Sequence, residues 1–269
     1  MKQASVPIQY YDIGSDSSKS VDSQIITETP VSLTVNGDVW LTFMCTPTDL
    51  EAMALGFLFN EGLIKNMQEV VQVRLCAAGD NVDVWLEHNT EKPDRWQRTS
   101  GCTGGVTSVN LDHLVPAGGS QNGSLLTTKQ INELVASLFD SQDLYRRSGG
   151  VHTSILTDGQ KVHIIAEDIG RHNTLDKIAG LCLMQDVQLE HRFIITTGRI
   201  SSEMLQKSAR MGVSIVISRT SPSSLSIELA IRLGITLIGY ARRDSFRLYT
   251  HPQRISFSME GITTSPVSR

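Results

Sequence analysis

Cys102 lies in a stretch whose composition suits a loop that does chemistry. Residues 99–108 read TSGCTGGVTS, and a run of Gly, Ser and Thr fits neither a strand interior nor a stable helix. A cysteine acts as a nucleophile when its thiol is accessible and its thiolate is stabilised. Neighbouring glycine N–H groups, Arg95 and Arg98 could supply that stabilisation. The residues alone leave two interpretations open: a reactive thiol, or one that merely falls between two domains.

The other three cysteines have less chemical character. Cys45 continues the alternation of Val39, Leu41 and Phe43, which places it in a core as a small apolar residue. Cys182 lies in an apolar helical segment, and Cys76 ends a strand. No two cysteines lie within four residues of each other, so the chain has no zinc-knuckle spacing and no thioredoxin-like pair.

Several arginines in the second half of the chain follow expected strands. Short β-branched strands are expected at 161–167, 192–197, 213–218 and 235–240, and helices at 173–184, 201–211 and 221–233. This alternation predicts a parallel α/β sheet. The connections that follow the strands contain, in order, Arg171, Arg199, Arg219 and the pair Arg242 and Arg243.

Four such connections would bring their arginines to one edge of the sheet. Ligands of open α/β sheets bind beyond the carboxyl ends of the strands. An arginine just before a helix opposes the helix dipole unless an anion lies between them. The pattern therefore predicts a phosphate-bearing, nucleotide-like ligand. The alternative is that each arginine pairs with a local acid, for example Arg171 with Asp168.

The elements around these residues are readable from turn and cap signals. Asn36-Gly37 predicts a hairpin, followed by a helix over about 50–62 that is capped by Thr48 or Asp49. Two further strands are expected before residue 90. In the second half, Asn173 with Asp176 suggests a capping box, and Ser221 a cap before Pro222. Gly212 and Gly234 suit helix ends.

These signals divide the chain into three parts. Residues 1–24 form a flexible lead-in, because 14–23 are small and polar. Residues 25–126 form a β-rich N-terminal subdomain, which includes the cysteine loop at 94–126. Residues 127–269 form an α/β domain that binds the predicted phosphate-bearing ligand.

Bulk properties limit the classes of function. The 269 residues carry a net charge of -4, which gives little support to nucleic-acid binding through a basic surface. The N-terminus lacks the apolar core of a signal peptide, and no apolar run approaches membrane-spanning length. These features predict a cytoplasmic protein with no membrane or nucleic-acid partner.

Several segments resemble one family closely. EDIGRHNTLDK (167–177) is highly specific, and SGGVHTSIL, LYTHPQRI, ETPVSLTVNG and ALGFLFNEGLI agree with it. On these motifs the chain resembles the formate dehydrogenase accessory protein family, FdhD, over roughly residues 26–256. The resemblance implies a C-terminal half with a cytidine deaminase-like mixed sheet and flanking helices. The zinc signatures H-x-E and P-C-x-x-C of the deaminases are absent from the sequence, which disfavours a hydrolytic deaminase.

The resemblance also implies an activity. Family members are sulfur carriers: a loop cysteine accepts sulfur as a persulfide from a cysteine desulfurase. The sulfur then passes to the molybdenum or tungsten bis(molybdopterin guanine dinucleotide) cofactor before its insertion into formate dehydrogenase. Whether this sulfur transfer makes the protein an enzyme is left open. Members are typically homodimers. No metal is bound tightly by the carrier itself.

Residues that match the family's functional positions suggest two kinds of site. Cys102 matches the persulfide cysteine. The segment that follows the last parallel strand matches the cofactor-binding segment. The complete set of expected cofactor-binding residues is Tyr240, Ala241, Arg242, Arg243, Asp244, Ser245, Arg171, His172, Arg199, Arg219, Ser221 and His251.

One position departs from the family pattern. The usual loop reads S-C-G-x-C-G, and its second cysteine aligns with Gly105 here. A single thiol has no internal resolving partner, so no disulfide can form within the loop. Three interpretations remain: Cys102 carries the persulfide alone, another cysteine such as Cys76 assists, or the chain binds cofactor without transferring sulfur. The last would make it a binding chaperone.

Overall fold

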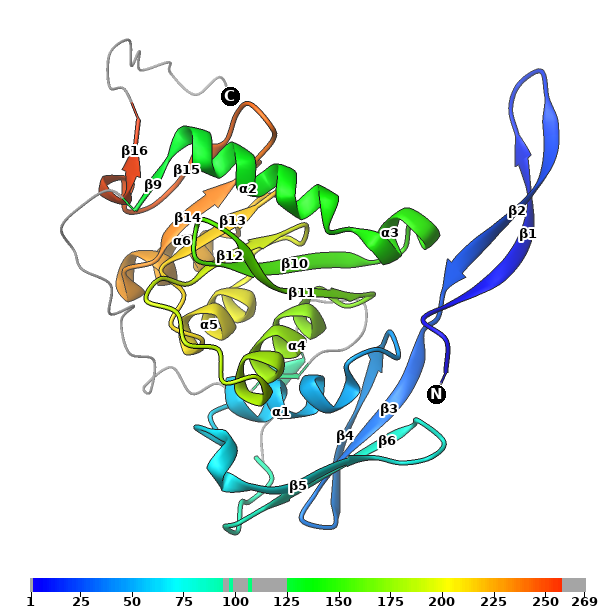
Figure 1. Ribbon diagram of the computed structural model, residues 1–269, viewed down its shortest axis with the longest axis vertical. Coiled ribbons are helices and arrows are strands. Elements are labelled where there is room, and N and C mark those ends of the chain that lie inside the picture. Colours follow the sequence, from blue (N-terminus) through cyan, green and yellow to red (C-terminus); the bar gives the residue numbers. More distant parts are fainter. Residues whose placement is uncertain (1, 94–96, 99–105, 108–124, 258–269) are drawn as a thin grey trace.

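The computed structural model describes residues 2–93, 97–98, 106–107 and 125–257 (Figure 1). Its elements stack in layers: an N-terminal sheet, helix α1, a layer of helices led by α4, a larger sheet, and helix α2 on the far side. The predicted mixed α/β architecture with a β-rich N-terminal part is therefore observed.

The N-terminal sheet has four strands in the order β4-β3-β6-β5. The predicted hairpin is confirmed, because Asn36 and Gly37 adopt φ values of 49° and 93°, as a tight two-residue turn requires. The strands are β3 (Thr29–Val35), β4 (Asp38–Cys45), β5 (Val70–Leu75) and β6 (Asn81–Leu86).

Helix α1 (Leu50–Asn60) packs on this sheet and is buried almost all round, as its apolar sequence predicts. A short 3-10 helix, η1 (Met67–Glu69), leads into β5. The predicted N-cap position, Asp49, is confirmed, although its side chain does not cap the helix. Asp49 occupies the N-cap with φ 49° and makes no side-chain cap hydrogen bond, and the hydroxyl of Thr48 instead accepts a hydrogen bond from Lys177.

The C-terminal sheet has six strands in the order β11-β10-β12-β13-β14-β15. β12, β13 and β14 are parallel, but β10 lies between β11 and β12 and is antiparallel to both. The sheet is therefore mixed, as the family resemblance implies, and the parallel sheet predicted from the strand–helix alternation is wrong. Two antiparallel pairings in succession nevertheless leave β11 pointing the same way as β12. The strands are β10 (His152–Thr157), β11 (Val162–Asp168), β12 (Phe193–Thr196), β13 (Ile215–Ser218), β14 (Thr236–Gly239) and β15 (Arg247–Leu248).

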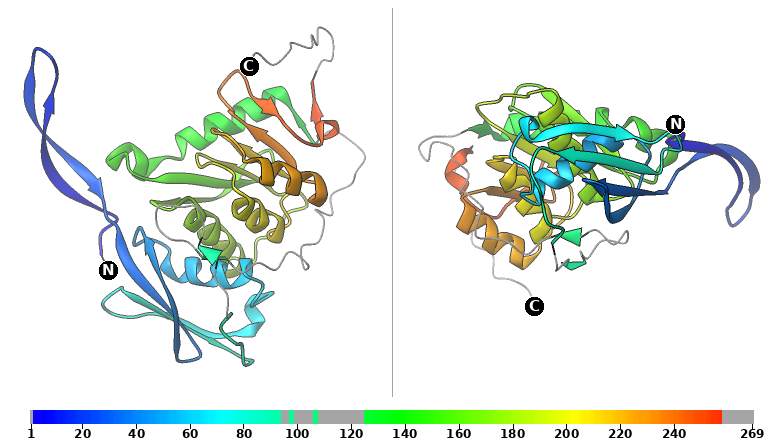
Figure 2. Two further views of the ribbon diagram at one scale, coloured as in Figure 1. Left: turned by 180° about the vertical axis from the view of Figure 1, so that it is seen from behind. Right: turned by 90° about the horizontal axis from the view of Figure 1, so that it is seen from below.

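Helices cover both faces of this sheet (Figure 2). α4 (Arg171–Met184), α5 (Ser202–Arg210) and α6 (Ser224–Leu233) pack on one face. The other face is covered by α2 (Thr128–Asp140), which is followed by α3 (Asp143–Ser148); the sequence analysis missed both. Shorter elements are β7 (Gln97–Arg98), β8 (Val106–Thr107), β9 (Leu126–Thr127), η2 (Pro252–Arg254) and β16 (Ile255–Ser256).

Two predicted helix starts are wrong. α4 begins two residues early, after Gly170, and the Asn173 amide donates to Asp168 and to the Met44 carbonyl instead of closing a capping box. α6 is capped by Ser223, whose hydroxyl accepts from the Ser226 N–H. Ser221 is thereby left in the connection before the helix.

The N-terminal lead-in is a hairpin, which corrects the expected flexible segment. β1 (Ser5–Ile13) and β2 (Ser18–Ile26) pair antiparallel without a register shift. A period-2 alternation is present at Val6, Ile8 and Tyr10, which share one face, but the small polar residues at 14–23 interrupt it.

The two halves of the molecule meet where α1 crosses α4. A Cβ added at Gly56 would lie 1.8 Å from the Asp176 carbonyl oxygen, and one added at Gly180 would lie 1.8 Å from the Ala52 carbonyl oxygen. Glycine at both positions lets the two backbones touch. Within the described residues, no helix is both long enough and apolar enough to span a membrane.

Candidate anion-binding site

The carboxyl ends of β11, β12, β13 and β14 share one edge of the C-terminal sheet, as the sequence predicts. Backbone hydrogen bonds join the connections that follow them. The Arg219 N–H donates to the Thr196 carbonyl at 3.1 Å, the Ile200 N–H to Ser221 at 3.2 Å, and the Tyr240 N–H to Thr220 at 3.0 Å. These bonds fix the connections against one another, so the side chains they carry are held in place.

A pocket of about 190 Å³ lies at this edge, where α4, α5 and α6 begin. The Ser201 and Ser223 hydroxyls cap α5 and α6 by accepting from the Met204 and Ser226 N–H groups. Three helix N-termini therefore surround one small space, and each favours an anion. The lining residues are Arg171, Arg199, Ile200, Ser201, Ser221, Pro222 and Ser223.

Four arginines of this edge have no acidic partner in the described part of the chain. No carboxylate there lies within 4.0 Å of Arg199, Arg219, Arg242 or Arg243. Asp168, the acid considered as a local partner, is bound by Lys177 at 2.7 Å. An anionic ligand would balance this excess positive charge.

The predicted arginines form two groups rather than one. Arg171 and Arg199 line the pocket on the α4–α6 side. Arg219 and Arg243 lie over the ring of Phe139, on the α2 side, at 4.3 and 5.8 Å from its centroid. A ligand that reaches both groups must extend across the end of the sheet.

The segment after β14 forms a tight turn beside the second group. The Ala241 N–H donates to the Ser218 carbonyl and the Arg242 N–H to the Ser245 carbonyl. Tyr240 has a left-handed φ of 50°, and the guanidinium of Arg247 lies 4.2 Å from the centroid of its exposed ring. The Ser245 hydroxyl donates to the Asp244 carboxylate at 3.2 Å. All six predicted residues of this segment thus lie at the edge.

The histidine in the first turn of α4 is neutral. His172 is 6% exposed, and burial, followed by the charges of Lys207 and Arg171, lowers its pKa to about 2. Its Nε2 lies 3.3 Å from the Ser201 hydroxyl. Burial and then Arg171 also lower the pKa of His152, whose Nδ1 lies 3.3 Å from the Thr197 hydroxyl. Both rings act as hydrogen-bonding groups rather than as cations.

His251 does not belong to this site. β15 runs antiparallel to β14, so the chain after β15 returns to the amino-terminal edge of the sheet. There the Nε2 of His251 lies 3.2 Å from the Ala230 carbonyl, and the nearby buried Arg254 donates to the carbonyl of Gly234. Both side chains bind the C-terminal end of α6. The sequence analysis did not allow for this reversal of direction.

Part of the EDIGRHNTLDK segment does not line the pocket but holds elements of the fold together. Asp168 and Lys177 form a pair with no solvent exposure and an N–O distance of 2.7 Å. Asp168 also accepts from the Thr46 and Gly170 N–H groups, and Lys177 donates to the Thr46 and Glu167 carbonyls. The pair holds the chain after β4 against the start of α4.

A second buried pair starts from the neighbouring residue of α4, Asp176. Asp176 accepts two hydrogen bonds of 2.6 Å from Lys207 of α5 and one of 2.8 Å from Asn60 of α1. The Lys207 ammonium also lies 5.5 Å from the centroid of the Phe57 ring. The sequence analysis missed both pairs; the partners of the second pair lie 31 residues apart in the chain.

Comparison with known proteins shows the family of this chain. The sequence profile described as "FdhD/NarQ family" matches residues 26–256. The chain belongs to the FdhD/NarQ family. It is 36% identical over 237 residues to "Sulfur carrier protein FdhD" of Bacillus pumilus, with 87% of this chain and 90% of the relative covered. The protein of the same name from Bacillus subtilis is 35% identical, with 87% and 91% covered.

A solved structure has the same fold. It is described as "Crystal structure of a putative formate dehydrogenase accessory protein from Desulfotalea psychrophila". It matches with a TM-score of 0.80 and 30% sequence identity, and covers 94% of this chain and 100% of its own.

The cysteine predicted to carry sulfur in this family member, Cys102, lies outside the described residues. Of the three described cysteines, two are poor nucleophiles. Burial and then Asp168 raise the pKa of Cys45 to about 12, and burial raises the pKa of Cys182 to about 11. The thiol of Cys76 donates to the Asp80 carboxylate at 3.0 Å. Neither Cys45 nor Cys182 therefore suits the reactive role that the sequence predicts for Cys102.

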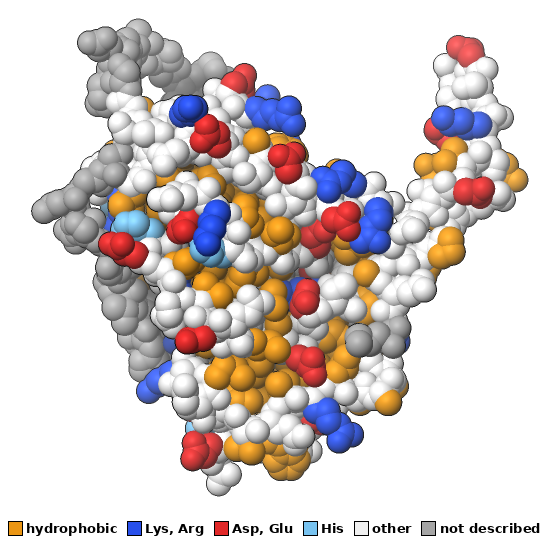
Figure 3. Space-filling model, viewed as in Figure 1, with side chains coloured by type: hydrophobic (Ala, Val, Ile, Leu, Met, Phe, Trp, Pro, Cys, Tyr) orange, Lys and Arg blue, Asp and Glu red, His pale blue; other side chains and the backbone are white. Residues whose placement is uncertain are grey.

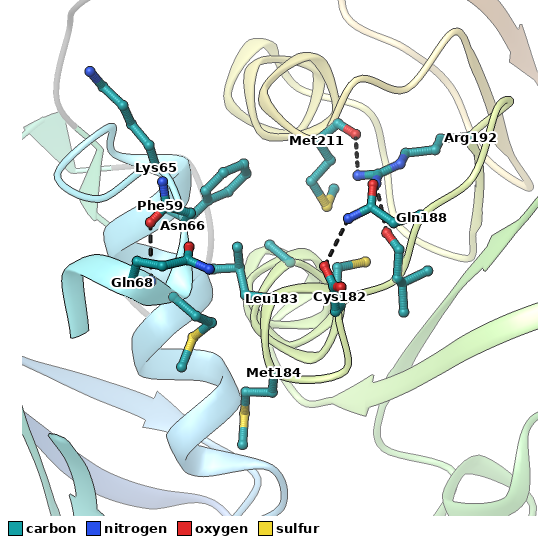
Figure 4. Close-up of a pocket in the computed structure, with 14 residues that line it drawn as sticks. Phe59, Lys65, Asn66, Gln68, Cys182, Leu183, Met184, Gln188, Arg192 and Met211 are labelled. Carbon is teal, nitrogen blue, oxygen red and sulfur yellow. Dashed lines mark hydrogen bonds between the residues drawn. The ribbon is translucent and has the colours of Figure 1, made fainter. Parts of the chain in front are cut away.

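A larger pocket, of about 580 Å³, lies at the opposite end of α4. Figure 4 shows Phe59, Lys65 and Gln68 on one side of it and the last turn of α4 on the other. Here the Arg192 guanidinium already donates to the Met211 and Val187 carbonyls. In the described part of this family member, no cluster of three or more His, Cys, Asp or Glu side chains could hold a metal ion.

Proposed function

We propose that this chain is a sulfur carrier in the maturation of formate dehydrogenase. The names of the Bacillus relatives and the description of the Desulfotalea structure both point to this role. The structural observation that carries the proposal is the edge where three helix N-termini meet arginines such as Arg199, which has no carboxylate partner among the described residues.

The proposed transfer uses the thiolate of Cys102. It attacks the terminal sulfur of a persulfide on a cysteine desulfurase. A new S–S bond forms at Cys102, the S–S bond of the desulfurase breaks, and the desulfurase cysteine leaves as a thiolate. The sulfur atom passes from the desulfurase to Cys102 with no net oxidation or reduction, and the proton of the persulfide stays on the transferred sulfur. One thiolate is sufficient, so Gly105 does not prevent this step.

The proposed substrate is the molybdenum or tungsten bis(molybdopterin guanine dinucleotide) cofactor. Its phosphates would bind between Arg171, Arg199 and the N-termini of α4, α5 and α6. Its extended shape suits two arginine groups separated by the end of the sheet. In this proposal the carrier acts in the cytoplasm as a homodimer, with a cysteine desulfurase and formate dehydrogenase as its protein partners. The cytidine deaminase-like classification of its C-terminal sheet stays a prediction.

Mass spectrometry after incubation with a desulfurase and cysteine tests the sulfur step. The wild-type protein should gain about 32 Da, the mass of one sulfur atom, and reductant should remove it. Cys102→Ala should gain none, and Cys76→Ala, the matched control, should gain as much as wild type. A wild-type protein that gains no sulfur, or a Cys102→Ala protein that gains as much, contradicts the proposal.

Isothermal titration tests the ligand independently of sulfur. Guanosine diphosphate should bind the wild-type protein, and changing Arg242 and Arg243 to Ala should weaken its binding. Adenosine diphosphate reports whether the base is distinguished. Equal affinity of wild type and the double variant would remove these two arginines from the site.

Gly105 favours a second candidate, a chaperone that shelters the cofactor without transferring sulfur. Such a protein needs the arginines but not Cys102. Complementation of a strain that lacks its own carrier separates the two candidates. A chaperone restores formate dehydrogenase activity when it carries Cys102→Ala, whereas a sulfur carrier does not.

A further inference from the structure

The β1–β2 hairpin projects from the body of the molecule as an arm (Figures 1 and 2). Nine residues in each strand give it a length of about 30 Å. In the described part of the chain, the arm meets the body at its base, where Ile26 lies against Gly150 after α3. The family profile begins at residue 26, so the arm precedes the region that the profile matches.

The two faces of the arm differ in chemistry. One face carries apolar side chains from both strands: Val6 opposite Ile25 and Tyr10 opposite Val21, with Ile8 between them. Val6, Ile8, Tyr10 and Ile25 are 41 to 46% exposed. This face, here called the apolar face, bears no charge until the Asp12–Lys19 pair near the tip.

The opposite face is mixed. There Gln9 donates to Asp22, and the exposed Tyr11 and Ile13 lie opposite Ser20 and Ser18. Each apolar side chain on this face therefore has a polar cross-strand neighbour. Figure 3 shows hydrophobic side chains on the arm, at a distance from the body of the molecule.

A two-stranded ribbon is marginally stable in water unless something covers its apolar side. The described part of this chain offers no such cover beyond the base of the arm. A partner that covers the apolar face would therefore stabilise the arm, and a second copy of the same chain is a partner that is always present with it.

We infer that the apolar face of the arm is the contact between two copies of this chain. The charge pattern favours an identical partner, because two uncharged faces meet across a two-fold axis without like-charge repulsion. A differently charged partner would find no complementary group on this face between its base and the Asp12–Lys19 pair. The inference rests on the homodimer in the proposed function and gives it a surface, but it does not depend on sulfur transfer.

Light scattering on the full chain tests the inference. The wild-type protein should have twice the 29.6 kDa mass of one chain. Ile8→Asp places a charge at the centre of the apolar face and should give a monomer. Tyr11→Asp, the matched control on the other face, should stay dimeric. Val21→Asp should repeat the effect of Ile8→Asp from β2.

Hydrogen exchange of residues 5–26 supplies a readout that needs no variant. Exchange of these amides in the wild-type protein should become faster on dilution, as dimers dissociate, while exchange in α4 should not change. A monomeric wild type, a dimeric Ile8→Asp protein, or arm exchange that is independent of concentration would overturn the inference. Loss of the persulfide at Cys102 with an intact dimer would instead count against the sulfur step alone.

Discussion

The EDIGRHNTLDK segment contributes to two regions that treat charge in opposite ways. At the junction with α1, Asp168 and Asp176 are matched by Lys177 and Lys207 at 2.7 Å or less. At the edge of the sheet, Arg199 and the arginines beyond it have no carboxylate within reach among the described residues. A charge with a buried partner stabilises the fold, whereas a charge left without one is available to a ligand.

The largest effect is expected when one partner of a buried ion pair at the junction is removed. Lys177→Met leaves the Asp168 carboxylate buried without its cation, which should lower the free energy of unfolding by about 3–5 kcal/mol. Denaturant titration measures the loss. Lys129→Met, which removes an exposed lysine 3.7 Å from Glu133, should cost about 0.5 kcal/mol or less. Equal losses in the two variants would show that the buried pair has no special role.

The second largest effect is expected when the helices are forced apart. In Gly180→Ala the new Cβ would meet the Ala52 backbone, which cannot yield as a side chain can, so the loss should be about 3 kcal/mol. Intrinsic helix propensity acts in the opposite direction, because alanine is favoured over glycine by about 1 kcal/mol in a helix. A stabilised Gly180→Ala protein in thermal unfolding would therefore disprove the close contact.

Substitutions at the edge of the sheet should change ligand affinity rather than the free energy of unfolding. Arg199→Ala should weaken guanosine diphosphate binding by about 10-fold to 100-fold, the range for a charge-assisted contact. Its free energy of unfolding should change little, because the side chain is exposed. Arg232→Ala, at the far end of α6, is the control and should bind as wild type. If both variants bind equally well, Arg199 has no role in the pocket.

The smallest expected effect is a dependence of the free energy of unfolding on pH, caused by His172. His172 has a pKa of about 2 when folded, against about 6.5 when unfolded, so below pH 6.5 the unfolded state binds more protons. Stability is therefore lost as pH falls through 6.5, by about 1 kcal/mol from this residue between pH 6.5 and 5.5.

The variant His172→Asn should lose less stability than wild type over that interval. Denaturant titrations at several pH values measure the difference, and the gap between the two proteins should be constant above about pH 7.5, where the unfolded histidine is neutral. Parallel curves at all pH values would mean that His172 titrates normally.

Local sequence signals predicted much of this molecule. The Asn36-Gly37 turn, the strands β3 to β6 and the arginines at the edge all follow from patterns within a few residues. The outcome differed where distant segments decide the structure. The insertion of β10 between β11 and β12, the return of β15 that carries His251 away, and the Asp176–Lys207 pair depend on contacts across tens of residues. Residues 5–26 failed for another reason, since small polar residues obscured their alternation.

The residues that frame the smaller pocket come from one continuous stretch, 171–223, while Cys102 stands well upstream of it. The two proposed tasks, ligand binding and sulfur transfer, are thus encoded in separate stretches of chain and can be altered one at a time. A loop of the family's two-cysteine pattern could replace residues 99–105 without altering the pocket. Equally, the connections after β12 and β13 could be changed to bind a different ligand without altering the cysteine loop.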